Sequence, residues 1–488
     1  MYKWITISSP ADYTQLATML SAEYDSGKVA QRLRAGLTSG VAGILIEFEY
    51  VDKDYRSTYY NYYAKKGRRY RPDCVRLHLF DRTVSAGPDA GSLSCADERL
   101  SDHYYGYLVL RPTLQSTVGR SLLSPDIRQG AAGLVMRSKH TVHVLGYRLE
   151  VHGFPSMDQH VDIAVCAHVS CWAILRYYSQ RFPRHAEVLL QEVVKMAHAF
   201  DPGGLVPSNG LIMAEAERVF QAAGTYPLVI TRGEWGSFYR QLLAYLESGF
   251  PLFTGMNDIG HAVVVIGHSV KNPPKRQHAT DPASHAWQLV SHFTVVDDNQ
   301  LPYICIEGPS ANESVAVAPV GAKYTADSFD QFIVALPEKI YYSAKAVEEL
   351  VPTVAADLLG FGPGEHIFRY FVTTLSRFRQ EIRENASQYK ESFIQAIMDL
   401  PAAQFIWVVE FSTDEEWESG KISARVVIDA TAGESDPNPV WLAHTAKTAI
   451  VFDRSDITHE EAELDVGTTH GAPLTRMDLN LRPIVRIP

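Results

Sequence analysis

A cysteine that could act as a nucleophile, Cys166, stands at the start of an amphipathic stretch. Val165, Val169 and Trp172 recur there at helical spacing. This pattern predicts a helix over residues 164–182 that carries the thiol in its first turn. Free N–H groups and the helix dipole at that position favour a thiolate over a thiol. Cys166 is therefore the predicted nucleophile.

A cysteine nucleophile needs a base, and His261 is the candidate. Gly260 and His261 come directly before five apolar residues, a pattern typical of a strand buried on both faces with the imidazole at its mouth. The next apolar strand ends in Asp297 and Asp298, and either carboxylate could reach the imidazole and orient it. Both aspartates could instead simply begin a turn with Asn299.

Two residues near the nucleophile could help to stabilise an oxyanion. Gln159 lies seven residues before Cys166 (166 − 159 = 7), and its side-chain amide could donate one hydrogen bond. Ala167 is small enough to let a substrate carbonyl approach the backbone N–H donors of the first helical turn. The predicted site therefore combines a thiol, an imidazole, a carboxylate and an amide.

With these residues in view, the region resembles the double-glycine leader peptidases that process bacteriocin precursors, and their stand-alone relatives. Tyr177 and Tyr178 follow Cys166 at the spacing that this family has. The segment Gly-Phe-Pro at 249–251 is similar to the Gly-x-Pro strand that precedes the catalytic histidine of the family. The resemblance covers roughly residues 155–305.

The resemblance implies an α+β fold in which a central papain-like cysteine peptidase domain packs its nucleophile helix on an antiparallel sheet. It also implies a bacterial thiol protease with a triad of Cys166, His261 and Asp297 or Asp298, with Gln159 at the oxyanion. The implied partner is a peptide or protein substrate, and neither a metal nor another cofactor is implied.

The sequence departs from the family in two places. Alanine stands at 167 where the family has glycine, and the histidine-to-aspartate separation of 36 residues (297 − 261 = 36) is longer than in the family. Residues 269–291 are polar and rich in Pro, Lys and His, which predicts an exposed surface insertion that accounts for the extra length.

Two other interpretations concern the same helix. The Ser-Cys-Trp-Ala at 170–173 looks like the sequence around the nucleophile of papain itself, which would make Cys171 catalytic. Cys171 would lie about 140° around the helix from Cys166, in its second turn, so we favour Cys166. A zinc site built from Cys166, His168 and Cys171 is disfavoured because the spacing does not match the usual zinc motifs.

The 488 residues are more than one core comfortably fills, so several domains are expected. We predict an N-terminal α+β domain at 1–146, the cysteine hydrolase domain at 147–345 and a C-terminal α+β region at 346–488. Helices are expected at 12–36 and 365–385, among others. An aromatic, basic stretch at 55–71 is interpreted as a structural element that buries its tyrosines.

The bulk properties exclude several classes of function. A formal net charge of −11 argues against a general nucleic-acid binder, which needs a basic field. No apolar run reaches the ~20 residues that span a bilayer, and the N-terminus lacks a signal-peptide pattern. Five scattered cysteines without a Cys-x-x-Cys pair indicate a reducing cytoplasm. We therefore expect a cytoplasmic protein without nucleic-acid or membrane partners.

Three functions remain open from sequence alone. The favoured hypothesis is hydrolysis of a peptide or isopeptide bond through a thioester. The same site could instead perform another acyl transfer or a deamidation, because the choice depends on what reaches the thioester. A non-catalytic binding module that keeps the papain-like fold is the third hypothesis.

Overall fold

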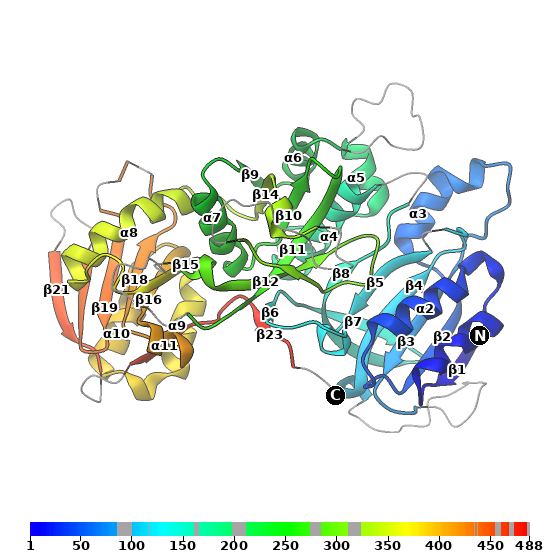
Figure 1. Ribbon diagram of the computed structural model, residues 1–488, viewed down its shortest axis with the longest axis horizontal. Coiled ribbons are helices and arrows are strands. Elements are labelled where there is room, and N and C mark those ends of the chain that lie inside the picture. Colours follow the sequence, from blue (N-terminus) through cyan, green and yellow to red (C-terminus); the bar gives the residue numbers. More distant parts are fainter. Residues whose placement is uncertain are drawn as a thin grey trace.

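The computed structural model describes residues 1–84, 100–115, 117–160, 165–197, 211–273, 285–310, 324–433, 435–436, 438–453, 460–467 and 473–485. Over this part the chain is α+β, as predicted, with helices packed around three large sheets that follow one another along the long axis of the molecule (Figure 1). None of the described helices combines the length and apolar character that crossing a bilayer requires.

The first sheet has seven antiparallel strands in the order β1-β2-β3-β4-β5-β8-β7. Their bounds are Tyr2–Thr6 (β1), Gly43–Tyr50 (β2), Cys74–Phe80 (β3), Tyr104–Leu110 (β4), Val118–Leu123 (β5), Ser138–Val144 (β7) and Tyr147–Ser156 (β8). The sheet thus continues through β8, beyond the boundary that the sequence suggested at residue 146. In the aromatic, basic stretch that follows β2, Tyr55 and Tyr63 are buried, while Tyr60 is exposed.

The helix expected at 12–36 is broken into pieces. Helix α1 spans Gln15–Met19 and α2 spans Ser26–Gly36, with short 3₁₀ turns before and between them. Leu20 leaves the helical conformation, and Asp25 adopts a left-handed backbone with φ of 44°. A residue with positive φ cannot continue a right-handed helix, so the apolar spacing alone overstated its length. Helix α3 then spans Lys53–Asn61.

The central sheet contains the strand order β13-β12-β11-β10-β14-β9; in addition, β6 pairs with β11, and β23 pairs with β6. The bounds are Leu134–Val135 (β6), Tyr226–Thr231 (β9), Leu252–Met256 (β10), His261–Val270 (β11), Val290–Val296 (β12), Ile304–Glu307 (β13), Gln331–Leu336 (β14) and Arg482–Pro483 (β23). The helices around it are Cys166–Arg181 (α4), Leu190–Ala197 (α5), Met213–Ala222 (α6) and Trp235–Glu247 (α7). All neighbouring pairs on the six-strand path are antiparallel, and both α4 and α7 pack against β10 and β11. The apolar residues of β11 are consequently buried on both faces, as predicted.

The polar segment at 269–291 differs from the predicted exposed insertion. Its middle, 274–284, lies outside the described residues. Its C-terminal part is packed, because His285, Trp287 and Leu289 are all buried and β12 already begins at Val290. The predicted pairing of the two flanking strands is nevertheless confirmed by the register between β11 and β12.

The third sheet has the order β15-β16-β18-β19-β20-β21. Its strands are Ile367–Thr374 (β15), Phe405–Ser412 (β16), Ala424–Asp429 (β18), Val440–Thr445 (β19), Thr448–Asp453 (β20) and Glu460–Asp465 (β21). The helices of this region are Ala344–Leu359 (α8), Leu375–Glu384 (α9), Glu391–Asp399 (α10) and Asp414–Glu418 (α11). A separate two-stranded sheet pairs Lys421–Ile422 (β17) with Leu474–Thr475 (β22). The prediction of a helix over residues 365–385 is wrong for the first half of that range. Residues 367–374 are rich in aromatic and β-branched types, and they pair with β16 along their whole length.

Candidate active site

The thiol of Cys166 lies in the first turn of α4, as the sequence predicted, although the helix begins at Cys166 and not at residue 164. Val165, just before it, has an extended backbone, so the helix begins at the cysteine itself. Cys166 is partly exposed, whereas the following residues from Ala167 to Tyr178 are buried. Cys171 has no exposed surface, and this burial raises the pKa of its thiol well above the ordinary value. The two thiols thus lie in opposite environments.

The imidazole of His261 lies at the first residue of β11, directly after a turn. Gly260 closes this turn with φ of 59°, and its N–H donates to the carbonyl oxygen of Asn257 at 3.1 Å. Glycine adopts that left-handed backbone without the strain that a Cβ would cause. On α4 the hydroxyl of Ser170, one helical turn beyond Cys166, donates to the carbonyl oxygen of Ala262 at 3.5 Å. This contact ties the helix that begins at Cys166 to the strand that begins at His261.

Strand register brings Asp297 next to His261. Val264 of β11 pairs with Val296 of β12, so Asp297 follows one residue after the last paired position on its strand. Continuing the antiparallel register places Asp297 opposite residue 263, diagonal to His261 and on the same face of the sheet. The observed separation between His261 Nε2 and Asp297 Oδ2 is 3.3 Å.

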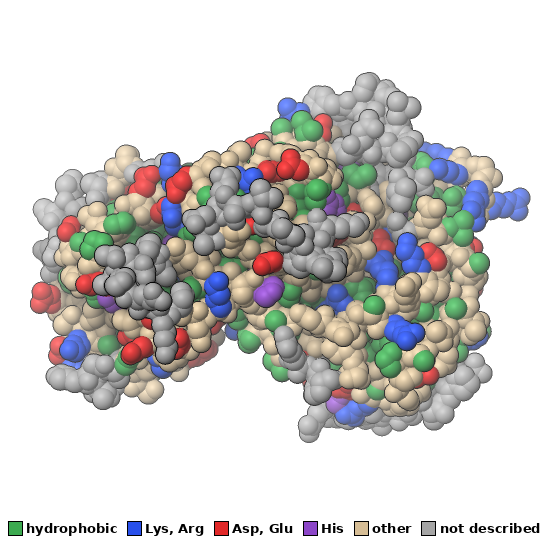
Figure 2. All heavy atoms as spheres, in the orientation of Figure 1, with side chains coloured by type: hydrophobic (Ala, Val, Ile, Leu, Met, Phe, Trp, Pro, Cys, Tyr) green, Lys and Arg blue, Asp and Glu red, His purple; other side chains and the backbone are tan. Residues whose placement is uncertain are grey.

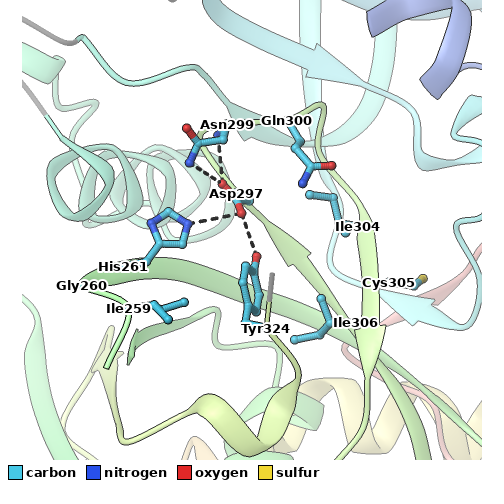
Figure 3. A pocket seen from close by; sticks show the side chains of 10 residues that line it. All are labelled: Ile259, Gly260, His261, Asp297, Asn299, Gln300, Ile304, Cys305, Ile306 and Tyr324. Atoms are coloured by element: carbon cyan, nitrogen blue, oxygen red, sulfur yellow. Dashed lines mark hydrogen bonds and ion pairs between the residues drawn. The ribbon is translucent and has the colours of Figure 1, made fainter. Parts of the chain in front are cut away.

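Three donors hold the Asp297 carboxylate (Figure 3). The hydroxyl of Tyr324 donates to Oδ2 at 2.8 Å. The backbone N–H and the side-chain amide of Asn299 donate to Oδ1 at 2.9 and 3.1 Å. Both oxygens of this buried carboxylate are therefore fixed, and the oxygen that accepts from Tyr324 also faces the imidazole.

Asp298 lies farther from the imidazole than Asp297 does. Its Oδ1 is 4.0 Å from His261 Nε2 and accepts a hydrogen bond from the amide of Asn299 at 3.0 Å. Its Oδ2 is buried without a hydrogen-bond partner among the described residues. Burial, together with the nearby Asp297 charge, raises the pKa of Asp298 to about 7. Geometry and charge therefore both select Asp297 as the group that orients His261.

The electrostatics of the site favour a charged imidazole. Burial alone would lower the pKa of His261, but Asp297 and the sulfur of Cys166 outweigh it and raise that pKa from 6.5 to about 10. Burial would raise the pKa of Asp297, yet the hydrogen bonds and charge of its neighbours hold it below its usual range. Since Nε2 faces Asp297, Nδ1 is the ring nitrogen left for the thiol. The arrangement suits a thiolate–imidazolium pair.

Gln159, the predicted oxyanion donor, reaches the same site. It is half-buried, and its side-chain amide donates to Asn299 Oδ1 at 3.5 Å. Its main chain is held by the fully buried Arg111, whose Nη2 donates to the carbonyl oxygens of Asp158 and Gln159 at 3.1 and 3.3 Å. Asp158 in turn accepts two hydrogen bonds from Arg32 at 2.6 and 3.0 Å. The first sheet and its helices thus position the segment that carries Gln159.

A cleft of about 730 Å³ opens over the thiol, and three of the predicted residues, Gln159, Cys166 and His261, line it. Its polar wall includes Gln159, Cys166, His261 and Asn299, and its apolar wall is formed by Leu211, Ile212, Met213, Phe253 and Met256. A second cavity of about 490 Å³ lies on the Asp297 side of the imidazole, where Ile304, Ile306 and Tyr324 line it (Figure 3). His261 therefore separates a nucleophile side from a carboxylate side.

Two residues of the site were not predicted in these roles. The sequence predicts Asn299 only as part of a turn. In the structure its backbone N–H donates to the side chain of Asp297, two residues earlier, which is the hydrogen bond that defines an Asx turn. Tyr324 gave no signal in the sequence, because it lies 27 residues beyond Asp297 and outside any periodic pattern. Its role depends wholly on tertiary structure.

A metal interpretation of this site can be tested against its donors. One oxygen or nitrogen from each of His261, Asp297 and Asp298 lies within 4.8 Å of the others, and this is the one such group found in the described part of the chain. The Asp297 oxygens already accept from Tyr324 and Asn299. The contact between His261 and Asp297 therefore accounts for two of these three groups. Cys166, His168 and Cys171 do not form such a group in the same described residues.

Searches of protein-family profiles, curated proteins and solved structures find no match for this chain. The geometry of the site is therefore the observation that bears on the function of this chain.

Removing the Tyr324 hydroxyl tests the support of Asp297. We expect Tyr324→Phe to lower kcat about two- to tenfold and to cost about 1 kcal/mol of unfolding free energy, because one hydrogen bond to a buried carboxylate is lost.

Tyr303→Phe is the matched control. Its hydroxyl donates to the carbonyl oxygen of Leu123 at 2.7 Å and accepts from the backbone N–H of Phe154 at 2.6 Å, away from His261 and Asp297, so this variant should lose at least as much stability and keep kcat. Urea unfolding and steady-state rates check both variants. Equal kcat for Tyr324→Phe and wild type would mean that Tyr324 does not support Asp297.

Proposed function

We propose that this protein is a cysteine hydrolase with a papain-like arrangement, in which Cys166 is the nucleophile and His261 its base. The observation that carries the proposal is the meeting of a thiol at a helix N-terminus with an imidazole oriented by a buried carboxylate. A helix packed on an antiparallel sheet, with the histidine at the start of one strand and the aspartate just after the next, supports the resemblance to leader peptidases.

In the proposed first step, the Cys166 thiolate attacks the carbonyl carbon of a peptide or isopeptide bond. The amide hydrogen of Gln159 and the backbone N–H of Cys166 stabilise the oxyanion. His261 gives its proton to the leaving amine, the C–N bond breaks and a thioester remains. Water then attacks the thioester while His261 takes a proton from it, and release of the carboxylic acid restores the thiolate. Asp297 keeps the imidazole oriented throughout.

Another acyl acceptor would turn the same site into a transferase, and a primary amide substrate would make it a deamidase. Hydrolysis and transfer give different products. Incubation with peptide substrates in the presence and absence of a primary amine, followed by mass spectrometry, therefore separates these two activities. A hydrolase gives the free acid in both conditions. An amide adduct that forms in preference to the acid would favour transfer.

The oxyanion role of Gln159 gives a direct test of the mechanism. We expect Gln159→Ala to reduce kcat by about 10²-fold with little change in KM, because the lost hydrogen bond forms mainly in the transition state. Gln300→Ala is the control, since Gln300 is exposed and lines only the cavity on the Asp297 side. It should keep wild-type kcat. Unchanged kcat in Gln159→Ala would remove Gln159 from the mechanism.

A further inference from the structure

A separate cavity of about 380 Å³ lies where the first sheet meets α4, among β2, β3, β5, β7 and the start of α3. Four of its lining residues are cationic, namely Lys53 on α3, Arg76 on β3, Arg120 on β5 and Arg176 on α4. Glu187 is the one acidic residue among those that line it in the described part of the chain. In the space-filling view, basic side chains with acidic ones beside them appear over the region of β4 and β8, below α3 (Figure 2). The cavity therefore presents a mainly cationic wall.

Each arginine is held in place by a carboxylate. Arg76 Nε donates to Glu47 at 2.7 Å, and Arg120 Nη2 lies 2.9 Å from Asp52 Oδ2. These contacts use part of the five N–H donors that a guanidinium carries. Arg120 Nε is buried and has no hydrogen-bond partner among the described residues. The carboxylates therefore fix the guanidinium groups without using all their donors.

The fourth cation belongs to the nucleophile helix. Arg176 Nη2 lies 3.6 Å from Asp54 Oδ2, and Arg176 Nη1 also pairs with Glu187. Burial, reinforced by nearby Asp52, raises the pKa of Asp54, while Arg176 and Arg120 oppose this shift. Glu187 also pairs with Lys53 of α3, so this one carboxylate is shared by two of the four cations.

Burial and the neighbouring arginines both act on a histidine that lines the cavity, His140. Burial and then the charges of Arg176 and Arg120 lower the pKa of His140 to about 4, although Glu187 opposes this. Arg76 is also held rigid, because its guanidinium lies 4.0 Å from the centre of the Tyr50 ring and donates to the carbonyl oxygen of His143 at 3.1 Å. A ligand would meet these cations already oriented, which reduces the entropy cost of binding.

We propose that this cavity binds a small oxyanion, the phosphate or carboxylate group of a small molecule. Guanidinium groups pair with both kinds of oxyanion through parallel N–H donors, and three of them converge here from three elements. Arg176 follows Cys166 by 10 residues (176 − 166 = 10), which is about 15 Å along a helix, so this site is distinct from the catalytic cleft. The proposal does not depend on the hydrolase function.

Thr141, an exposed residue of β7 that lines the cavity, allows a test without removal of a buried arginine. Pyrophosphate and citrate are titrated separately into the full-length protein by calorimetry at low ionic strength. We expect Thr141→Asp to weaken the binding of the bound anion at least about tenfold, and Thr141→Lys to retain or strengthen it. Arg120→Gln should also weaken binding, provided that its thermal melt shows a folded protein.

Each outcome bears on the proposal. Binding of pyrophosphate alone supports a phosphate ligand, and binding of citrate alone supports a carboxylate ligand. Failure of wild type to bind either anion below millimolar concentration overturns the proposal. Equal binding by Thr141→Asp, Thr141→Lys and wild type overturns it as well, because the anion would then sit elsewhere. Neither result affects the reactivity of Cys166, which is measured independently by alkylation.

Discussion

Cys166→Ala is expected to abolish both hydrolysis and rapid alkylation at near-neutral pH while leaving the fold intact. Loss of the attacking atom of a nucleophile–base pair reduces kcat by a factor on the order of 10⁶. The side chain begins α4 and is only partly buried, so little packing is lost. Peptide cleavage and iodoacetamide labelling at pH 6–7, followed by mass spectrometry, measure the two losses. Far-UV circular dichroism checks the fold.

Cys171→Ala is the matched control on the same helix. Its thiol is fully buried, and burial raises its pKa, so the native protein should not alkylate there at neutral pH. The variant should keep wild-type cleavage and lose about 1 kcal/mol of unfolding free energy. The opposite result, with activity lost in Cys171→Ala and kept in Cys166→Ala, would move the nucleophile to the papain-like Ser-Cys-Trp-Ala at 170–173.

The same labelling experiment addresses the non-catalytic alternative. His261→Ala should slow alkylation of Cys166 at pH 6–7 about 10- to 100-fold, because the imidazolium that stabilises the thiolate is lost. If native Cys166 reacts no faster than the cysteines of the denatured chain, a binding module that keeps only the fold becomes the better interpretation.

The elements of the candidate site could be predicted because their signals are local. Cys166 begins a helix whose buried positions repeat every three or four residues. His261 begins a strand of consecutive apolar residues, and Asp297 follows another such strand. The ends of buried helices and strands lie at the surface of the core, where polar side chains can meet. The apolar runs in the sequence mark those ends, and the polar residues beside them are therefore the candidates for a shared site.

The remaining features depend on contacts between distant segments, which a sequence pattern does not specify. The choice of Asp297 over Asp298 follows from the register of Val264 with Val296 and from the hydroxyl of Tyr324. Arg111 directly follows β4 of the first sheet and yet holds the main chain of Gln159. Strand pairing likewise turned residues 367–374 into β15, although the apolar spacing there also fits a helix.

Asp297→Asn is expected to lower kcat by about 10²- to 10⁴-fold, with the thiol still present. The amide cannot stabilise an imidazolium as a carboxylate does, and it can favour the wrong tautomer of the neutral ring. Asp298→Asn should lose far less, since Asp298 is 4.0 Å from His261 Nε2 and Asp297 is 3.3 Å from it. Steady-state rates of the two variants decide between the carboxylates.

The dependence of stability on pH gives a second, independent signature of Asp297. The pKa of His261 is raised in the fold, so its contribution to stability is complete below pH 6.5 and is lost as pH rises toward about 10. The pKa of Asp297 is lowered, so its contribution is present above 3.8 and is lost as pH falls further. Asp297→Asn should therefore show its largest deficit in unfolding free energy, about 2 kcal/mol, between about pH 4 and 6.5.

Asp298→Asn should show the opposite trend. The pKa of Asp298 is raised from 3.8 to about 7, so in wild type the fold holds a proton that the unfolded chain releases, and stability falls as pH rises through this interval. The asparagine variant escapes this loss, and its stability relative to wild type should increase from about pH 4 to 7. Urea unfolding at pH 4, 5.5 and 7.5 measures both variants. Asp298 would instead be the partner of His261 if Asp298→Asn showed both the larger loss of kcat and the deficit in unfolding free energy between about pH 4 and 6.5. Only the aspartate whose charge pairs with the imidazolium should give that deficit when it is replaced by asparagine.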